Sequence, residues 1–137
     1  MGAEPEVEDR EIRVLVVDDD PSVRRMVRII LTMEDDYHVV GEATDGEQAV
    51  AMAGELRPDV VLLDLEMPGT DGLASIPRIR ELAPSARIAV LSSFPDPYTL
   101  ADALHLGADT YLDKATSLSE LPVLIRSLAR QGPETAA

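Results

Sequence analysis

A run of apolar residues that ends in a carboxylate is the strongest constraint on the fold of this chain. The residues VVLL at 60–63 directly precede Asp64. Four consecutive apolar residues put apolar side chains on both faces of a strand, as in a parallel sheet covered by helices on each side. Four other short apolar runs accompany this one. Strands are therefore predicted at 12–17, 38–43, 59–64, 87–92 and 110–113.

Helix signals follow each predicted strand. The predicted N-caps are Asp20, Asp45, Asp71, Asp96 and Ser119, with Ser117 as the alternative to Ser119. Pro21 and Pro97 follow their caps at the first helical position. A cap at Ser119 puts Pro122 in the first turn of the last helix. That helix is predicted to end near residue 130. Pro77 falls past the first turn of the third helix. An interior proline costs roughly 3 kcal/mol, so a kink or a late helix start is predicted there.

Alternating strands and helices with short connections indicate an α/β fold with right-handed crossovers. We predict a doubly wound, five-stranded parallel sheet of flavodoxin-like (βα)5 topology, with strand order 2-1-3-4-5. The 137 residues suggest one domain. That domain is predicted to span 12–131, after a disordered tail at 1–11 and before a tail or linker start at 132–137.

Charge and composition exclude several classes of function. The net charge of −14 argues against direct binding to a nucleic acid backbone, which needs clustered basic residues. No apolar run has transmembrane length, and the acidic, polar N-terminus is unlike a secretory signal. The absence of cysteine excludes disulfides and thiolate metal sites, and it fits a cytoplasmic protein.

Polar residues gather where the predicted strands end. The residues at these ends are Asp18, Asp19, Asp20, Asp64, Ser92, Ser93, Asp113 and Lys114. In an open parallel sheet, ligands bind beyond the carboxyl ends of the strands. Two carboxylates about 4 Å apart repel by roughly 4 kcal/mol at an effective dielectric of 20, and a bound divalent cation offsets this cost. Oxygen ligands without His or Cys favour Mg²⁺, with Mn²⁺ or Ca²⁺ as alternatives.

The predicted cation site is suited to phosphoryl chemistry. The sequence has neither a GxxxxGK[ST] loop nor a GxGxxG motif, so a bound nucleotide is not expected. A carboxylate can itself accept a phosphoryl group, and Asp64 is the candidate nucleophile. Lys114 is the only lysine among 12 basic residues. Its compact, flexible ammonium suits a phosphoryl oxygen.

Four segments together resemble the receiver domain of two-component response regulators. They are VLVVDDDP, DVVLLDLEMPGTDG, IAVLSS and GADTYLDK, and the resemblance covers 12 to about 131. The resemblance implies a phosphoacceptor at Asp64, Mg²⁺ ligands at Asp18, Asp19, Asp64 and the Glu66 backbone carbonyl, a switch hydroxyl at Ser92, a phosphate-pairing Lys114 and a switch aromatic at Tyr111. Simple packing is the alternative for Tyr111.

The resemblance also implies partners and an output. A sensor histidine kinase is the expected donor, small phosphodonors also serve, and the only catalysis expected is the domain's own phosphorylation and dephosphorylation. The segment ELPVLIRSLARQG is similar to receivers that precede LuxR-type helix-turn-helix domains. We therefore expect transcriptional regulation through a DNA-binding domain absent from this chain, with phosphorylation-linked homodimerisation. A stand-alone regulator is the alternative.

Some positions depart from the receiver pattern. Ala115 stands where many receivers have a cis proline, so a trans bond is expected. Asp113 would weaken the pull of Lys114 if its side chain pointed into the site, and Phe94 occupies a position associated with dephosphorylation rate. His38 and His105 are expected to be surface residues.

Two rival functions remain. A hydrolase of the haloacid dehalogenase type also uses a strand-end aspartate with Mg²⁺. It would need a second aspartate where Glu66 stands, and it would need a cap domain, which this sequence does not show. An atypical receiver would act by protein–protein interaction without phosphorylation, but the retention of all the site residues speaks against it.

Overall fold

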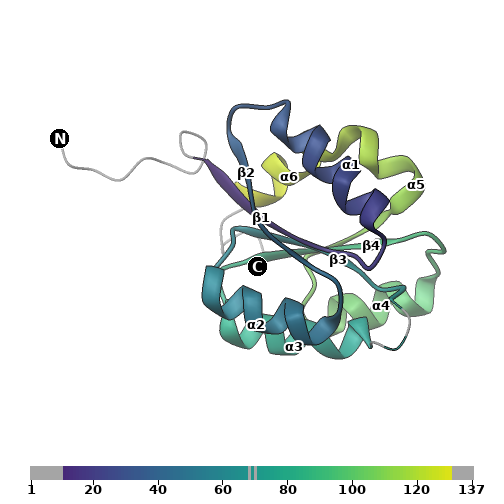
Figure 1. Cartoon of the computed structure of the whole chain (residues 1–137). Coiled ribbons are helices and arrows are strands. Elements are labelled where there is room, and N and C mark those ends of the chain that lie inside the picture. Colours follow the sequence, from purple (N-terminus) through teal and green to yellow (C-terminus); the bar gives the residue numbers. More distant parts are fainter. Residues whose placement is uncertain (1–10, 68, 70, 131–137) are drawn as a thin grey trace.

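The computed structural model describes residues 11–67, 69 and 71–130 (Figure 1). The strands form one parallel sheet in the order β2-β1-β3-β4-β5, as predicted. The elements are β1 (Ile12–Val17), α1 (Pro21–Thr32), β2 (Tyr37–Ala43), α2 (Gly46–Leu56), β3 (Val60–Asp64), α3 (Gly72–Leu82), β4 (Arg87–Ser92), α4 (Pro97–Leu106), β5 (Thr110–Asp113), α5 (Lys114–Ser117), the 3-10 helix η2 (Leu118–Glu120) and α6 (Leu121–Ala129).

The predicted strands agree closely with the observed ones. Three have the predicted bounds, while β2 begins one residue earlier, at Tyr37, and β3 one residue later, at Val60. The predicted tails fall almost wholly outside the described residues, which begin at Glu11 and end at Arg130. Within the described residues, no helix is long and apolar enough to span a bilayer.

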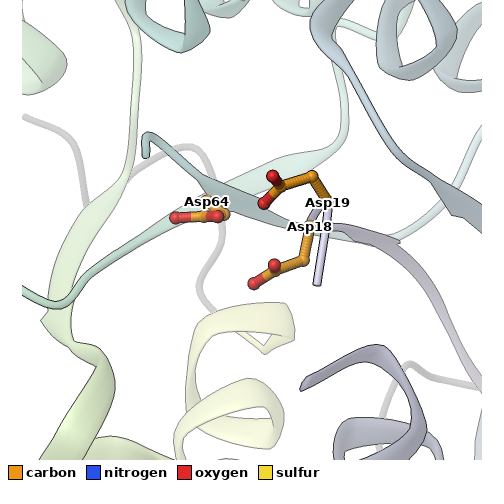
Figure 2. Close-up of side chains that lie close together, drawn as sticks. All are labelled: Asp18, Asp19 and Asp64. Atoms are coloured by element: carbon orange, nitrogen blue, oxygen red, sulfur yellow. The ribbon is translucent and has the colours of Figure 1, made fainter. Parts of the chain in front are cut away.

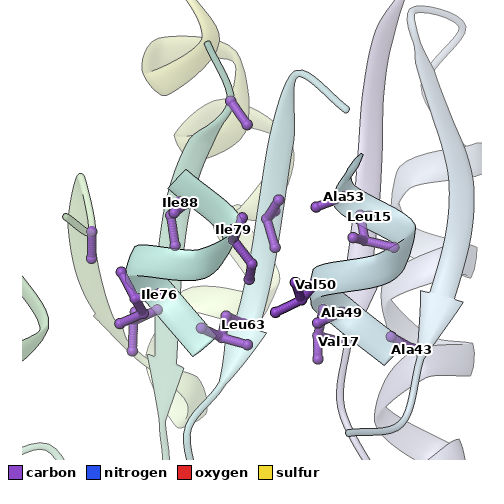
Figure 3. Close-up of a cluster of buried hydrophobic side chains, with 14 of the residues drawn as sticks. Leu15, Val17, Ala43, Ala49, Val50, Ala53, Leu63, Ile76, Ile79 and Ile88 are labelled. Carbon is purple, nitrogen blue, oxygen red and sulfur yellow. The ribbon is translucent and has the colours of Figure 1, made fainter. Parts of the chain in front are cut away.

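Helices cover both faces of the sheet. In Figure 1, α1, α5 and α6 lie above the sheet, and α2, α3 and α4 lie below it. The sheet therefore separates two buried apolar clusters. Figure 3 shows the cluster beneath the sheet, where Ile76 and Ile79 of α3 lie near Leu63 of β3. All five residues of β3 are buried, which explains why its sequence is apolar on both faces.

Four of the predicted N-caps are confirmed. Asp20, Asp45, Asp71 and Asp96 precede α1, α2, α3 and α4, and each carboxylate accepts a backbone N–H of its own first turn at 2.8–3.2 Å. These bonds satisfy N–H groups that have no partner within the helix. The caps therefore set where the chain turns from each strand end into the following helix.

The structure corrects two local details. Helix α3 begins directly after its Asp71 cap and continues through Pro77, so of the two alternatives predicted there the late start does not occur, while the kink stays a prediction. Ser119 lies within η2, and α6 begins at Leu121 without a side-chain cap. Pro122 does lie in the first turn of α6, as predicted.

Core packing beneath the sheet gives a first testable prediction. Ile79 is fully buried, whereas Ile29 on α1 is 52% exposed. Ile79→Ala is expected to lower the free energy of unfolding by about 2–5 kcal/mol, because it leaves a cavity under β3 and β4. Ile29→Ala is the matched control, with an expected loss of less than about 1 kcal/mol. Urea unfolding measures both, and equal losses would contradict the assignment of the core.

Candidate functional site

The carboxyl ends of four neighbouring strands bring the predicted site residues to one edge of the sheet. Asp18 follows β1, Asp64 and Ser92 end β3 and β4, and Lys114 follows β5. Asp18, Asp64 and Ser92 are each only 2% exposed. Such burial is unusual for carboxylates and is costly unless charges or hydrogen bonds compensate it.

Three carboxylates converge at this edge. Asp18, Asp19 and Asp64 each offer one oxygen, and the three oxygens all lie within 4.8 Å of one another (Figure 2). Asp19 is exposed, so the cluster opens to solvent on that side. Oxygen ligands in this arrangement fit a hard divalent cation such as Mg²⁺. The carboxylate part of the predicted ligand set is thus assembled by the fold.

Lys114 neutralises part of this negative charge. Its Nζ lies 2.9 Å from Oδ2 of Asp18 and 3.4 Å from Oδ1 of Asp64. Burial opposes the charged ammonium. The hydrogen bond to Asp18 and the charge of Asp64 outweigh that effect, so the pKa of Lys114 lies above its usual value. Lys114 therefore remains charged and holds two strand ends together.

The environment of Asp64 disfavours its negative charge. Burial raises the pKa of this carboxyl above its usual value. The backbone N–H of Glu66 donates to Oδ1 at 3.0 Å and opposes the rise, Asp18 adds to it, and Lys114 also opposes it. A cation bound beside Asp64 would therefore stabilise the charged form of this carboxyl.

The loop that carries Asp18 is held by a residue that sequence reasoning missed. Nη1 of Arg24 donates to the backbone carbonyl of Asp18 at 2.7 Å, and Nε of Arg24 donates to Glu42 at 3.1 Å. The backbone N–H of Asp20 also donates to the Asp18 carboxylate, at 2.9 Å. Nothing in the sequence distinguishes Arg24 from the other arginines of α1, because the contact depends on how β1 and β2 pair.

The ion pairs of Glu42 predict a measurable dependence of stability on pH. The hydrogen bond from Arg28 holds the pKa of Glu42 below its usual value of 4.5, and Arg24 lowers it further against the opposing effect of burial. A lowered pKa means that this contribution is complete above pH 4.5 and disappears as the pH falls through the folded-state value. Glu42→Gln is therefore expected to cost about 0.5–1 kcal/mol at neutral pH and little at low pH.

Urea unfolding at neutral and acidic pH measures this difference. Glu81→Gln is the control, because it changes an exposed glutamate on α3. An equal loss for Glu42→Gln at both pH values would contradict the ion-pair explanation.

The side chain of Glu66 makes contacts that the sequence did not reveal. Only its backbone carbonyl was predicted to have a role. Its carboxylate accepts the Ser92 hydroxyl at 2.5 Å, the Ser93 N–H at 2.9 Å and the Phe94 N–H at 3.2 Å. Burial alone would raise the pKa of Glu66, but these hydrogen bonds outweigh it, and the pKa is lowered. Ser92 is therefore bonded to Glu66 and not to Asp64.

Tyr111 and Asp113 belong to β5, the strand that directly precedes Lys114. The Tyr111 hydroxyl is buried and has no hydrogen-bond partner within the described part of the chain. The Asp113 carboxylate accepts the N–H of Ala115 at 2.9 Å and caps α5, so it serves the local backbone. No cis peptide occurs among the described residues, in agreement with the trans bond expected at Ala115.

The two histidines lie away from the site. His38 and His105 are both exposed, as predicted.

Comparison with known proteins identifies the family. A family model described as "Response regulator receiver domain" matches residues 14–126. The nitrate/nitrite response regulator protein NarL of Escherichia coli (strain K12) is 44% identical over 101 residues, which are 74% of this chain and 47% of NarL. The chain therefore spans about half the length of this relative.

Solved structures with the same fold support this result. A two-component response regulator of the LuxR family from Aurantimonas sp. SI85-9A1 has a TM-score of 0.81 at 30% identity, covering 92% of this chain and 93% of that one. A chain of the CheX–CheY–BeF3–Mg²⁺ complex from Borrelia burgdorferi has a TM-score of 0.77 at 28% identity, covering 89% and 90%. The sequence, the fold and the carboxylates at the strand ends agree. The chain therefore belongs to the response regulator receiver domain family.

Proposed function

We propose that this chain accepts a phosphoryl group on Asp64 from the phosphohistidine of a sensor histidine kinase. The observation that carries the proposal is the buried Asp64 carboxylate, which lies against two other carboxylates and the Lys114 ammonium. Such a pocket offers a nucleophile together with groups that handle charge. Small phosphodonors such as acetyl phosphate serve as alternative donors.

The transfer exchanges one bond to phosphorus for another. An Asp64 oxygen forms the new P–O bond while the N–P bond to the donor imidazole breaks. The imidazole keeps the electron pair and takes a proton from solvent. Lys114, already 3.4 Å from Asp64, is placed to pair with a phosphoryl oxygen. Attack of water on the phosphorus later releases inorganic phosphate and restores the Asp64 carboxylate.

The proposed cation ligands are Asp18, Asp19, Asp64 and the Glu66 backbone carbonyl. Mg²⁺, or Mn²⁺ in its place, would supply positive charge that stabilises the phosphoryl oxygens during transfer. The related complex from Borrelia burgdorferi contains Mg²⁺ together with BeF3, which supports this choice of ion. Asp19 is exposed and gives the ion access from solvent. Arg24 and the Asp20 amide orient Asp18 before any ion arrives.

The output is a change in the population of two conformations. In our proposal Ser92 turns toward the phosphoryl group and Tyr111 changes position after it, so that the face formed by α4, β5 and the following helices is altered. Moving a population from 1:99 to 99:1 needs roughly 5.5 kcal/mol, which a few charge-assisted hydrogen bonds supply. Homodimerisation would then regulate transcription through a DNA-binding domain. The LuxR-family neighbour supports that output.

Intact mass spectrometry tests the proposal. The chain is incubated with acetyl phosphate and Mg²⁺, with EDTA as the control, and a mass increase of one phosphoryl group is expected only with the metal. Size-exclusion chromatography of the same samples tests for a dimer. No mass increase with acetyl phosphate or with a matched kinase would favour the atypical receiver. Repeated turnover of a small phosphoester would instead favour the hydrolase.

A further inference from the structure

The start of the β4–α4 loop is held by the side chain of Glu66, 26 residues earlier in the chain. Three donors meet its carboxylate: the Ser92 hydroxyl at 2.5 Å, the Ser93 N–H at 2.9 and 3.1 Å, and the Phe94 N–H at 3.2 Å. Hydrogen bonds to a carboxylate are shorter and stronger than neutral ones. This contact therefore fixes the loop in one arrangement.

A phosphoryl group on Asp64 would need a donor that Glu66 already holds. Asp64 pairs with Leu91 across β3 and β4, so Ser92 is the next residue along the neighbouring strand. A serine hydroxyl has a single hydrogen and cannot donate fully to two anions. Phosphorylation adds acceptor oxygens and replaces the one negative charge on Asp64 with up to about two, beside the existing Glu66 carboxylate. The two anions therefore compete for Ser92.

We propose that the Glu66 carboxylate is a built-in competitor of the phosphoryl group, which holds Ser92 and its loop in the unphosphorylated arrangement. This inference rests on the proposed function of Asp64. Glu66 acts here as a positioning residue through Ser92, and its side chain makes no contact with the cation in this scheme. Phosphorylation must supply the free energy that displaces the Glu66 carboxylate from Ser92 before the loop can change its arrangement.

The surroundings of Glu66 leave room for its displacement. A pocket of about 360 Å³ is lined by Glu66, Ser92, Phe94 and Tyr111 among other residues. The Tyr111 hydroxyl has no hydrogen-bond partner within the described residues. Tyr111 lines this pocket, so a movement of Glu66 within it would change the surroundings of both Ser92 and Tyr111.

Amide hydrogen exchange, followed by NMR in the unphosphorylated chain, tests the contact itself. Exchange at Ser93 is expected to be about tenfold faster in Glu66→Ala than in the natural sequence, equivalent to about 1.4 kcal/mol of lost protection. A smaller change is expected at Phe94, because its N–H also donates to the Ser92 hydroxyl oxygen at 3.1 Å. Glu66→Gln keeps the shape and one acceptor oxygen, so an intermediate rate is expected. Glu47→Gln, which changes an exposed glutamate paired with Arg78, is the matched control and should change neither amide.

Binding of beryllofluoride with Mg²⁺, as a phosphoryl mimic, tests the competition. Glu66→Ala is expected to bind it about tenfold more tightly than the natural sequence, with Glu66→Gln between them and Glu47→Gln unchanged. Unchanged exchange, or faster exchange with unchanged affinity, would overturn the inference while leaving the proposed function intact. If neither the natural chain nor any variant bound the mimic or accepted a phosphoryl group, the proposed function would fail and the competition with it.

Discussion

Asp64→Asn is expected to abolish phosphorylation by every donor and, in metal-free buffer, to make the folded chain more stable. Asparagine has no carboxylate oxygen that can form the acyl phosphate. Its side-chain carbonyl can still accept the Glu66 N–H that Asp64 accepts at 3.0 Å. The substitution therefore removes the charge and keeps the shape.

The gain in stability follows from the cost of burying the Asp64 charge. Burial raises the pKa of Asp64 in the folded state above its usual value, and Asp18 adds to this rise. The charged form therefore favours the unfolded chain. This cost is complete above the folded-state pKa and disappears only as the pH falls from there through the usual value of 3.8. Residues that serve a reaction often lower stability in this way.

Thermal unfolding with and without Mg²⁺ measures this effect. The natural chain should gain stability from Mg²⁺ by mass action, whereas Asp64→Asn should gain much less. Asp45→Asn is the matched control, because asparagine caps α2 about as well as aspartate does. A variant that was less stable than the natural chain without metal would show that Asp64 is structurally favourable in its charged form.

Lys114→Met is expected to cause the largest loss of stability among single charge changes at the site. It leaves the carboxylates of Asp18 and Asp64, each 2% exposed, without the ammonium that lies at 2.9 and 3.4 Å. Removing one partner from a buried ion pair costs about 3–5 kcal/mol, because a charge stays buried and unpaired. Methionine fills similar space, so the loss reports charge and not a cavity.

A second substitution separates the charge effect from general damage. Adding Asp64→Asn to Lys114→Met should restore a large part of the lost stability, since only Asp18 then remains buried and charged among these three groups. Mg²⁺ should also stabilise Lys114→Met more than it stabilises the natural chain. Arg78→Met removes a cation from the exposed Glu47 pair and is expected to change the stability little, because solvent screens such a pair. Urea unfolding compares all four proteins, and a double variant no more stable than Lys114→Met would contradict the charge account.

The local structure of this protein was predictable from short-range signals. The apolar runs reproduce the strands within one residue, and four aspartates cap the helices where expected. Both signals act over a few residues, so the sequence carries them directly. Two details did not follow from these signals. Helix α3 continues through Pro77, and Asp113 caps a short helix that begins at Lys114.

The sequence predicted which site residues lie at the strand ends, but not which of them contact one another. Parallel strands bring their carboxyl ends to one edge, so Asp18, Asp64, Ser92 and Lys114 could be placed together from their positions alone. Which of them touch could not be read in the same way. The sequence by itself thus determined the elements, their order and the acidic edge of the sheet.

Only the tertiary structure decided the individual partners of these groups. Lys114 lies closer to Asp18 than to Asp64, Arg24 holds the carbonyl of Asp18, and Glu66 holds Ser92. These contacts join segments up to 96 residues apart, as between Asp18 and Lys114. Their geometry depends on sheet register and on how each loop leaves its strand. A side chain a few ångströms long finds its partner only after the backbone has brought the two together.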